Sequence, residues 1–392
     1  MSETEKIGKA VILNNNQNFT YHNPTTTNPI TPLQTFLEIS TSAFNYNVNY
    51  YKNIIGYHNK LAAVIKGNGY GHGLHQMAYV CQQNEHIDWL LVMQLSEALA
   101  LQNISKPILI LGYSDVPIEN AIGKNIQFMI DNLAYAQKLN TVGKQHSYQF
   151  DVHIKVDTGL SRMGILAPDA IIFIHQIQQL DYINIVGICS HFSASDSQPE
   201  FTAQQYTQFN NVITDLFSKN ITVPYIHMSN TAAISNIQYK NYFNFFRMGI
   251  GLYGLGHERS HLQPIMTWKT HITHIKTIPA NSYVSYAGEY QTKRTTRIAL
   301  LPIGYYDGYK FRFSNKTSVL INGTLAPVIG RVAMNITIVD VTDITADTDD
   351  EVVLMGPYQK IGAHDLAELG NIKNVREILV GINPAFTRII TE

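Results

Sequence analysis

Lys66 has the surroundings expected of a catalytic amine. It ends the apolar run Leu61–Lys66 (LAAVIK), and the glycine-rich segment Gly67–Gly73 (GNGYGHG) follows it directly. Desolvation at the end of a buried strand lowers the pKa of a lysine, so that the neutral amine is available for Schiff-base chemistry with a carbonyl. The glycines would let the chain turn sharply beneath a ligand.

Polar residues that follow other apolar runs complement such a lysine. Arg162 and Arg247 are cations placed to hold ring atoms or anionic oxygens. Thr231 and the backbone N–H groups near Gly249 could hold a phosphate. The remaining candidates at strand ends are Lys155, His191 and Asn230. A reactive lysine combined with a phosphate cradle indicates pyridoxal 5′-phosphate (PLP) as the cofactor.

Each of these residues also has an ordinary structural explanation. A strand-terminal lysine such as Lys66 is usually solvated or ion-paired, and His191 alone would be a hydrogen-bonded core histidine. Thr231 alone would be a helix N-cap. Their positions at five strand ends favour a common site, because five independent coincidences on one face are improbable. That inference depends on the strand assignment.

The elements that must position these residues are short apolar runs between helix-like segments. Most runs are continuously apolar, as expected for parallel strands covered by helices. Eight of them over roughly 220 residues predict an α/β fold, a (β/α)8 TIM-type barrel with its catalytic groups at the C-terminal strand ends. An open doubly wound sheet is disfavoured because no GxGxxG turn follows an early strand. The runs are Leu61–Lys66, Trp89–Met93, Pro107–Gly112, Ile126–Ile130, Phe150–Val156, Ile185–Ser190, Tyr225–Asn230 and Phe245–Ile250.

Alternating, β-branched segments replace this pattern from about Pro264 onward. They predict a second, mainly antiparallel β domain, interrupted by one helix at Ala363–Leu369. The expected strands are Met266–Ile278, Ser282–Tyr290, Arg297–Pro302, Ser318–Ile321, Pro327–Val341 and Glu351–Leu354. The predicted organisation is an N-terminal arm, mobile or loosely docked, at 1–34, a barrel domain at 35–265 and a β-rich domain at 266–392.

Composition narrows the classes of partner. The 392 residues carry a formal net charge of −1, which predicts no general attraction to nucleic acid or anionic lipid. The two cysteines, Cys81 and Cys189, form no CxxC spacing, so neither a disulfide framework nor a metal site is expected. No apolar stretch has the length of a membrane span, and no signal peptide is recognised. A small-molecule substrate and a cytoplasmic location are the expectation.

Long motifs in order along the chain resemble the fold-type III alanine racemases. The segment Ala63–Gly73 (AVIKGNGYGHG) looks like the PLP-lysine signature of that family. The likeness extends from about residue 35 to the second domain. The further motifs are Val156–Gly164, Ser190–Phe192, His227–Ala232, Phe246–Gly254, Val284–Tyr290, Leu301–Tyr309, Val319–Asn322 and Ala326–Met334.

The resemblance implies a two-base mechanism that interconverts L- and D-alanine. Lys66 would bind PLP covalently and act as one acid/base group, and Tyr286 of the partner subunit would act as the other. Arg247 would contact the pyridine nitrogen, and Arg162 the phenolic oxygen. His191 would orient the base network. The phosphate would be held by Tyr70, Asn230, Thr231, Gly249 and Ile250.

The resemblance further implies a homodimer with shared active sites. Tyr305 and Met334 would line the substrate site of the partner, together with Arg162, and a lone protomer would be inactive. Lys155 would be the lysine that is carbamylated in many members, where its negative charge positions Arg162. The product would supply D-alanine for cell-wall peptidoglycan.

Four departures from the family pattern bear on substrate breadth, cofactor affinity and rate. Gly67 and Gly69 stand where alanine is usual, which would loosen the loop. Ala333–Met334–Asn335 replaces Cys-Met-Asp, and Pro384 stands where some members have a phosphate-binding tyrosine.

Three alternatives stay open. The first is a broad-specificity amino-acid racemase of the same fold, which the Gly67 and Asn335 departures motivate. The second is a basic amino-acid decarboxylase, but that class usually depends on a cysteine in the second domain, and both cysteines here precede it. The third is a non-catalytic PLP carrier, but such proteins have a single domain.

Overall fold

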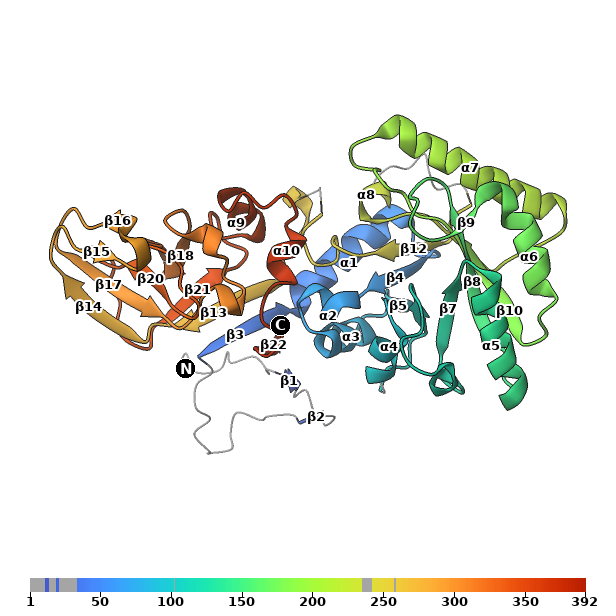
Figure 1. Ribbon diagram of the computed structural model, residues 1–392, viewed down its shortest axis with the longest axis horizontal. Coiled ribbons are helices and arrows are strands. Elements are labelled where there is room, and N and C mark those ends of the chain that lie inside the picture. Colours follow the sequence, from blue (N-terminus) through green and yellow to red (C-terminus); the bar gives the residue numbers. More distant parts are fainter. Residues whose placement is uncertain (1–10, 14–18, 21–33, 102, 235–241, 257–258) are drawn as a thin grey trace, which may run out of the picture. The chain divides into compact units, whose positions relative to one another are not determined.

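The computed structural model describes residues 11–13, 19–20, 34–101, 103–234, 242–256 and 259–392 (Figure 1). They form two compact units. The barrel unit comprises Asn45–Gly67 and Met77–Leu262, and the β unit comprises the described residues up to Phe44, Asn68–Gln76 and Gln263–Glu392. Most of the predicted N-terminal arm lies outside the described residues.

The barrel unit is built on eight parallel strands. Their order is β11-β10-β8-β7-β6-β5-β4-β12, and their side chains are buried almost without interruption, as expected for strands covered on both faces. The bounds are β4 (Lys60–Val64), β5 (Trp89–Val92), β6 (Ile108–Ile110), β7 (Ile126–Ile130), β8 (Phe150–Asp157), β10 (Ile183–Cys189), β11 (Tyr225–His227) and β12 (Phe245–Met248). A short strand, β9 (Ile165–Leu166), pairs with β8.

Asn244 closes the barrel between the first and last strands of this order. Its backbone N–H donates to the carbonyl of Ile226 in β11 at 3.2 Å, and its Oδ1 accepts from the N–H of Ile226 at 2.9 Å. Asn244 immediately precedes β12. The predicted (β/α)8 barrel is therefore confirmed.

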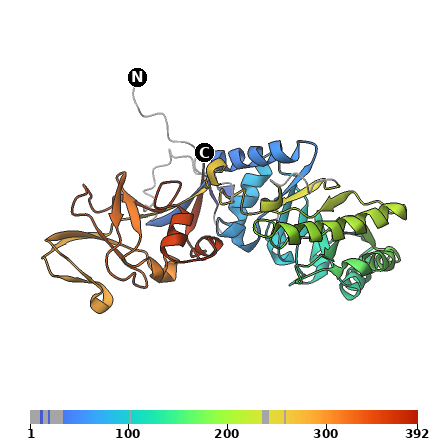
Figure 2. The same ribbon diagram turned by 90° about the horizontal axis from the view of Figure 1, so that it is seen from above.

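Helices between the strands cover the outside of the barrel. Helix α5 contacts β8 and β10, α6 contacts β10 (Figure 1), and α7 lies along one side of this unit in Figure 2. The bounds are α1 (Thr41–Ile55), α2 (Lys66–Tyr70), α3 (Leu74–Gln83), α4 (Leu95–Ala100), α5 (Leu133–His146), α6 (Ala170–Gln178), α7 (Pro199–Ser218) and α8 (Thr231–Ile234). Helices α1, α2 and α3 each contain residues of both units.

The β unit contains a mixed sheet of order β19-β18-β21-β13-β3-β22-β1-β2, a three-stranded sheet β14-β17-β20 and the hairpin β15-β16. Its bounds are β1 (Val11–Leu13), β2 (Phe19–Thr20), β3 (Thr35–Ser40), β13 (Met266–His271), β14 (His274–Ile278), β15 (Tyr283–Val284), β16 (Tyr290–Gln291), β17 (Thr296–Leu301), β18 (Ser318–Ile321), β19 (Thr324–Pro327), β20 (Thr337–Asp340), β21 (Glu351–Met355), β22 (Thr387–Thr391), α9 (Ala363–Leu369) and α10 (Arg376–Leu379). The predicted mainly β domain is confirmed, including the helix now labelled α9.

Buried and partly exposed side chains alternate along β13 in the large sheet, as expected for a strand with one face on the core. In β13 the buried residues are Met266, Trp268 and Thr270, so one face packs on the core and the other does not. Trp268 contacts Tyr309, whose ring contacts Phe313. These three aromatic side chains are fully buried and form the centre of the unit.

Strand β3 joins this sheet although it precedes the barrel strands in sequence. It pairs antiparallel with β13 and parallel with β22, with Phe36 opposite Thr387. The residues around β3 were predicted to begin the barrel domain at residue 35, whereas here they are hydrogen-bonded to the C-terminal strand. Three further details differ from the predicted strands. The segment Met266–Ile278 forms two strands, β13 and β14. The segment Ser282–Tyr290 is broken by the 3₁₀ helix Tyr286–Gly288, and Pro327–Val341 contains a loop before β20.

Among the described residues, no helix is both long and apolar enough to cross a membrane. The same part of the chain holds no cluster of His, Cys, Asp and Glu that could bind a metal ion.

Candidate active site

Lys66 lies two residues beyond β4 and begins α2, rather than ending a strand as predicted. Its side chain is half-buried. Burial lowers the pKa of the Lys66 amine, the positive charge of Arg162 lowers it further, and Glu97 opposes the shift. The surroundings of Lys66 therefore favour the neutral, nucleophilic amine.

The turn that follows Lys66 is left-handed. Gly67, Asn68, Gly69, Tyr70 and Gly71 all have positive φ angles, between 53° and 86°. This conformation costs little for glycine but about 1–2 kcal/mol for a residue with a Cβ atom. The glycines at 67 and 69, expected from the sequence to loosen the loop, therefore stand at positions where alanine would be strained.

Two side chains that sequence reasoning missed anchor the ends of this turn. Glu97 Oε1 accepts from the N–H of Gly67 at 2.9 Å, while Oε2 accepts from the N–H of Met93 at 2.7 Å. At the other end Arg388 is buried, and its Nε donates to the carbonyl of Gly71 at 2.9 Å. Burial lowers the pKa of Arg388 to about 10.

Tyr70 belongs to this turn and is the last residue of α2. Burial raises the pKa of its hydroxyl, which therefore stays protonated at neutral pH and can donate a hydrogen bond. The turn also depends on Gly71, because a Cβ atom there would lie 2.1 Å from the carbonyl oxygen of Leu379.

Positive charge gathers at the C-terminal ends of the barrel strands. Lys155 in β8 is only 5% exposed, and burial lowers its pKa to about 8. Burial also holds the pKa of His191, which follows β10, well below its ordinary value, and Arg247 adds to this shift. No carboxylate forms an ion pair with Lys66, Lys155, Arg162 or Arg247 within the described ranges. The site therefore suits an anionic ligand.

Arg247 in β12 is held by an extensive set of hydrogen bonds. Its Nη2 donates to the carbonyl of Ser190 at 2.7 Å and to Nδ1 of His191 at 2.9 Å. Its Nη1 donates to Nδ1 of His227. Because a guanidinium only donates, Nδ1 of each histidine must be the acceptor, which places the proton of each ring on Nε2.

The bond from Arg247 to His227 is the first in a chain of hydrogen bonds across the barrel. This relay runs from Arg247 through His227 and His153 to Gln127. His227 Nε2 donates to Nδ1 of His153 at 2.8 Å, and His153 Nε2 donates to Oε1 of Gln127 at 2.9 Å. His153 stands opposite Gly187 of the intervening strand β10. A Cβ atom at Gly187 would lie 2.1 Å from Nδ1 of His153, so only glycine lets this ring reach β11.

This relay was not predicted from the sequence. The only local signal is a histidine inside each of two apolar strands, at His153 in β8 and His227 in β11. Strand order and the glycine at 187 bring the two rings together. Burial lowers the pKa of His153 to about 3 and that of His227 well below its ordinary value.

Because burial keeps the histidines of the relay uncharged in the native protein, we predict that the free energy of unfolding decreases as the pH is lowered. Below pH 6.5 the unfolded chain binds a proton at His153, whereas the native ring, with a pKa of about 3, does not. Between pH 6.5 and 5 this linkage should remove about 2 kcal/mol of the free energy of unfolding for this one histidine. Denaturant titrations at pH 7 and pH 5 measure it. His153→Gln should reduce the pH dependence, whereas the exposed control His146→Gln should not; equal behaviour of the two variants would contradict the assignment.

The predicted phosphate-binding residues follow β11 and β12. Asn230 Oδ1 accepts from the N–H of Ala233 at 3.1 Å, so Asn230, rather than Thr231, caps helix α8. The buried Thr231 Oγ1 accepts from the N–H of Gly251 at 3.4 Å. Gly249 and Ile250 lie in the turn that follows β12.

Tyr286, Tyr305 and Met334 belong to the β unit, where all three are exposed. The structure joins the segments of the last two, because the N–H of Tyr305 donates to the carbonyl of Ala333 at 3.0 Å and the N–H of Tyr306 to that of Met334 at 3.0 Å. Asn335 donates through Nδ2 to Oδ2 of the buried Asp307 at 3.2 Å. An aspartate at 335 would instead place two carboxylates against each other.

Tyr286 lies in a strained turn. Its neighbours Ser285 and Ala287 have φ angles of 61° and 62°, which residues other than glycine rarely adopt. Ser285 Oγ donates to the carbonyl of Arg331 at 2.6 Å, and the Arg331 guanidinium pairs with Glu289. Such strain persists only when the surrounding contacts hold it, and it is concentrated at functional sites.

Comparisons with known proteins agree with this geometry. The sequence model described as alanine racemase, N-terminal domain matches residues 39–257, and the model of its C-terminal domain matches residues 265–390. Alanine racemase 2 of Caldanaerobacter subterraneus subsp. tengcongensis is 33% identical over 91% of this chain and 94% of its own. The alanine racemase of Halothermothrix orenii is 35% identical over 90% of this chain and 96% of its own.

Solved structures give the same result. The alanine racemase of Clostridium difficile 630 superposes with a TM-score of 0.85 at 30% identity, covering 92% of this chain and 96% of that one. The alanine racemase of Bacillus anthracis with bound L-Ala-P has a TM-score of 0.81 at 26% identity, covering 92% of this chain and 95% of that one. Matches over both units, in sequence and in structure, show that this chain belongs to the alanine racemase family of enzymes.

Proposed function

We propose that this protein is a PLP-dependent racemase that interconverts L- and D-alanine, and that its product supplies cell-wall peptidoglycan. The observation that carries the proposal is Lys66, a half-buried amine with a lowered pKa, among cations that form no ion pair with a carboxylate in the described part of the chain. Family membership supports alanine as the substrate, because the relatives compared above are named alanine racemases.

The residues at the barrel mouth fit PLP. The cofactor carries an aldehyde and a phosphate, and the site offers a reactive lysine and excess positive charge. Four bonds from Arg247 are described, and they leave its Nε–H without a partner among the described residues, available to a ring nitrogen. The phosphate would be held by Tyr70, Asn230, Thr231, Gly249 and Ile250. When bound, PLP supplies a ring system that withdraws electrons from the substrate Cα.

The protein residues would then bind, orient and exchange protons. Arg162 would hold the phenolic oxygen of PLP and the substrate carboxylate, and His191 would orient the base network through its bond to Arg247. Because Arg247 keeps its own protons, it would leave the ring nitrogen of PLP unprotonated, which would limit side reactions. Lys66 would move a proton on one face of Cα and the partner subunit's Tyr286 on the other, as inversion requires.

A homodimer with shared sites is part of this proposal. Tyr286 is 71% exposed, Tyr305 45% and Met334 53% in the single chain, although all three are assigned to a substrate site. Insertion into a second copy would bury them. Sedimentation equilibrium of the PLP-loaded protein should therefore give a dimer, and a stable monomer with full activity would exclude shared sites.

Carbamylation of Lys155 is the next prediction. Only a neutral amine reacts with CO2, and a pKa of about 8 leaves about half of Lys155 neutral at pH 8. The reaction releases a proton and leaves a carbamate, whose negative charge would pair with Arg162. Native mass spectrometry at pH 8 in bicarbonate should show the added mass of one CO2. Lys155→Met should abolish that addition, whereas Lys124→Met should not; an unmodified wild type would contradict the prediction.

The test of the function is chiral chromatography of L-alanine incubated with the PLP-loaded protein. D-Alanine should rise until the two enantiomers are equal. Absence of D-alanine, with PLP bound normally, would refute the activity. Turnover of lysine or arginine comparable with that of alanine would favour the broad-specificity racemase. That alternative is motivated by Gly67 and Asn335, which depart from the family pattern.

A further inference from the structure

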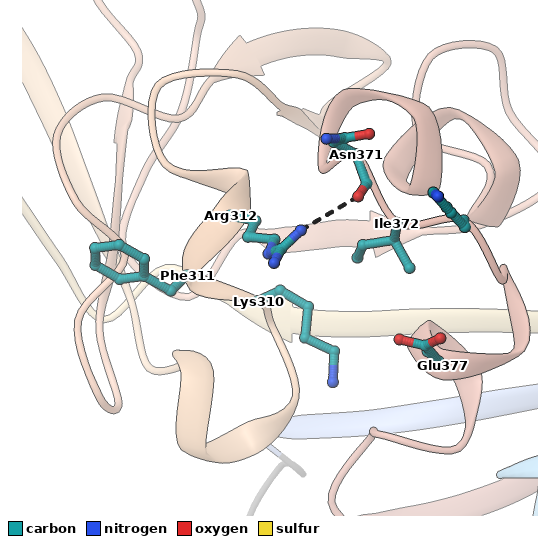
Figure 3. Close-up of a pocket in the computed structure, with 7 residues that line it drawn as sticks. Lys310, Phe311, Arg312, Asn371, Ile372 and Glu377 are labelled. Carbon is teal, nitrogen blue, oxygen red and sulfur yellow. Dashed lines mark hydrogen bonds between the residues drawn. The ribbon is translucent and has the colours of Figure 1, made fainter.

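The β unit contains a cavity of about 610 Å³ that no step above uses. This volume lies in the range of small-molecule sites. One wall is the 3₁₀ segment Phe311–Phe313, and the other is the turn between α9 and α10 (Figure 3). The lining side chains that matter are Lys310, Phe311, Arg312, Ile372, Lys373 and Glu377.

The cavity has excess positive charge. Lys310, Arg312 and Lys373 line it together with a single carboxylate, that of Glu377. Within the described residues no ion pair joins Glu377 to any of these cations. Arg312 Nη1 donates to the carbonyl of Asn371 at 3.2 Å, which fixes the guanidinium between the two walls (Figure 3). The net charge of these four side chains is +2 at neutral pH, which matches a dianion.

The amine of Lys310 lies close to the chain after α10. A Cβ atom added at Gly381 would stand 2.2 Å from Lys310 Nζ, so only glycine leaves room for the amine there. The side chain is half-buried, and the burial of its charge is only partly offset by Glu377. A second negative charge in the cavity would therefore stabilise the ammonium ion.

The cavity also has an apolar part. Phe311 is exposed, and it and Ile372 line the cavity from opposite walls (Figure 3). An aromatic ring and an aliphatic side chain beside cations suit an organic anion better than an inorganic one, because apolar area is buried together with charge.

We propose that this cavity binds a small organic phosphate monoester. Its phosphate, with a charge between about −1.5 and −2, lies against Lys310, Arg312 and Lys373, and its organic part lies on Phe311 and Ile372. Arginine and lysine are the side chains that commonly bind phosphate in proteins.

Side-chain contacts link the cavity to Tyr305 and Tyr286, two residues that we propose to lie in the partner's substrate site. The Phe311 ring lies edge-on to Tyr305, with centroids 6.5 Å apart, and Arg331 lies over Phe311 at 5.6 Å. Arg331 in turn pairs with Glu289, the residue directly after the 3₁₀ helix Tyr286–Gly288. A ligand that moves Phe311 therefore changes the support of Tyr305 and Tyr286, so the cavity is regulatory. This second step rests on the proposed function.

Isothermal titration of the PLP-loaded protein with phenyl phosphate tests the binding site. Filling the cofactor site first prevents the probe from binding there, and calorimetry detects binding without turnover. Saturable binding of one phenyl phosphate per chain is expected, tighter than that of inorganic phosphate. Lys310→Gln and Arg312→Gln should each weaken it about tenfold, the loss of one charge-assisted hydrogen bond. The exposed control Lys316→Gln should bind as the wild type does.

Three outcomes would overturn the proposal. These are the absence of saturable binding, equal affinities of Lys310→Gln and Lys316→Gln, and tighter binding of succinate than of phenyl phosphate. The regulatory step is tested separately, since phenyl phosphate should change the KM for L-alanine in the wild type but not in Arg312→Gln. An unchanged KM overturns regulation and leaves the binding site in place. Failure of racemisation itself does not affect the calorimetric result.

Discussion

Replacement of Lys66 by alanine is expected to lower the rate of racemisation by at least about ten-thousandfold, because it removes the covalent attachment of PLP and one of two proton-transfer groups together. The structure gives the physical reason. Burial and the charge of Arg162 lower the pKa of Lys66, and the left-handed turn from Gly67 to Gly71 fixes its backbone. No neighbouring lysine can replace it, since Lys155 lies within β8 and is 5% exposed.

The measurement combines activity with absorbance. D-Alanine formation is followed by chiral chromatography, and the absorbance of the lysine–PLP linkage is recorded after loading. Lys66→Ala should lose both signals, whereas Lys124→Ala, at an exposed lysine, should keep both. Activity of Lys66→Ala within tenfold of the wild type would show that another group carries the chemistry.

The barrel was predictable because its signal is local. Continuous apolar runs such as Ile126–Ile130 and Trp89–Met93 correspond closely to β7 and β5, which is Trp89–Val92. Residues placed at the ends of these runs therefore had to lie at one end of the barrel, as Lys155 and Arg247 do. Errors lie at the ends of the runs, as at Lys66, where the chain already leaves the strand, and at Ile185, where β10 has already begun at Ile183.

Features that depend on distant pairing were not predictable. Strand β3 pairs with β22, with Phe36 opposite Thr387, and nothing local in either segment indicates the other. The relay from Arg247 to Gln127 likewise needs the strand order and the glycine at 187. The turn at Tyr286 was predicted as a strand because its pattern alternates, and the positive φ angles of Ser285 and Ala287 have no sequence signature.

Tyr286→Phe is expected to lower racemisation by about a hundredfold to ten-thousandfold, the range for loss of one acid/base group. PLP binding should persist, since Lys66 is unchanged. The variant should also distinguish proton exchange on the two faces of Cα. In deuterium oxide, the Cα proton of one enantiomer should still exchange through Lys66, while its mirror image neither exchanges nor forms. Tyr283→Phe, three residues away and also exposed, is the matched control and should behave as the wild type does.

A mixture of two inactive variants decides whether the partner subunit supplies Tyr286. In a mixed dimer of Lys66→Ala and Tyr286→Phe chains, one site receives an intact Lys66 and the partner's Tyr286, and the other site receives neither. Random reassociation makes half of the dimers mixed, so about one quarter of wild-type activity should return. If Tyr286 acted within its own chain, every site in the mixture would lack one group and no activity would return. Restoration therefore requires shared sites, and its absence despite exchange of subunits would show that the partner subunit does not supply Tyr286.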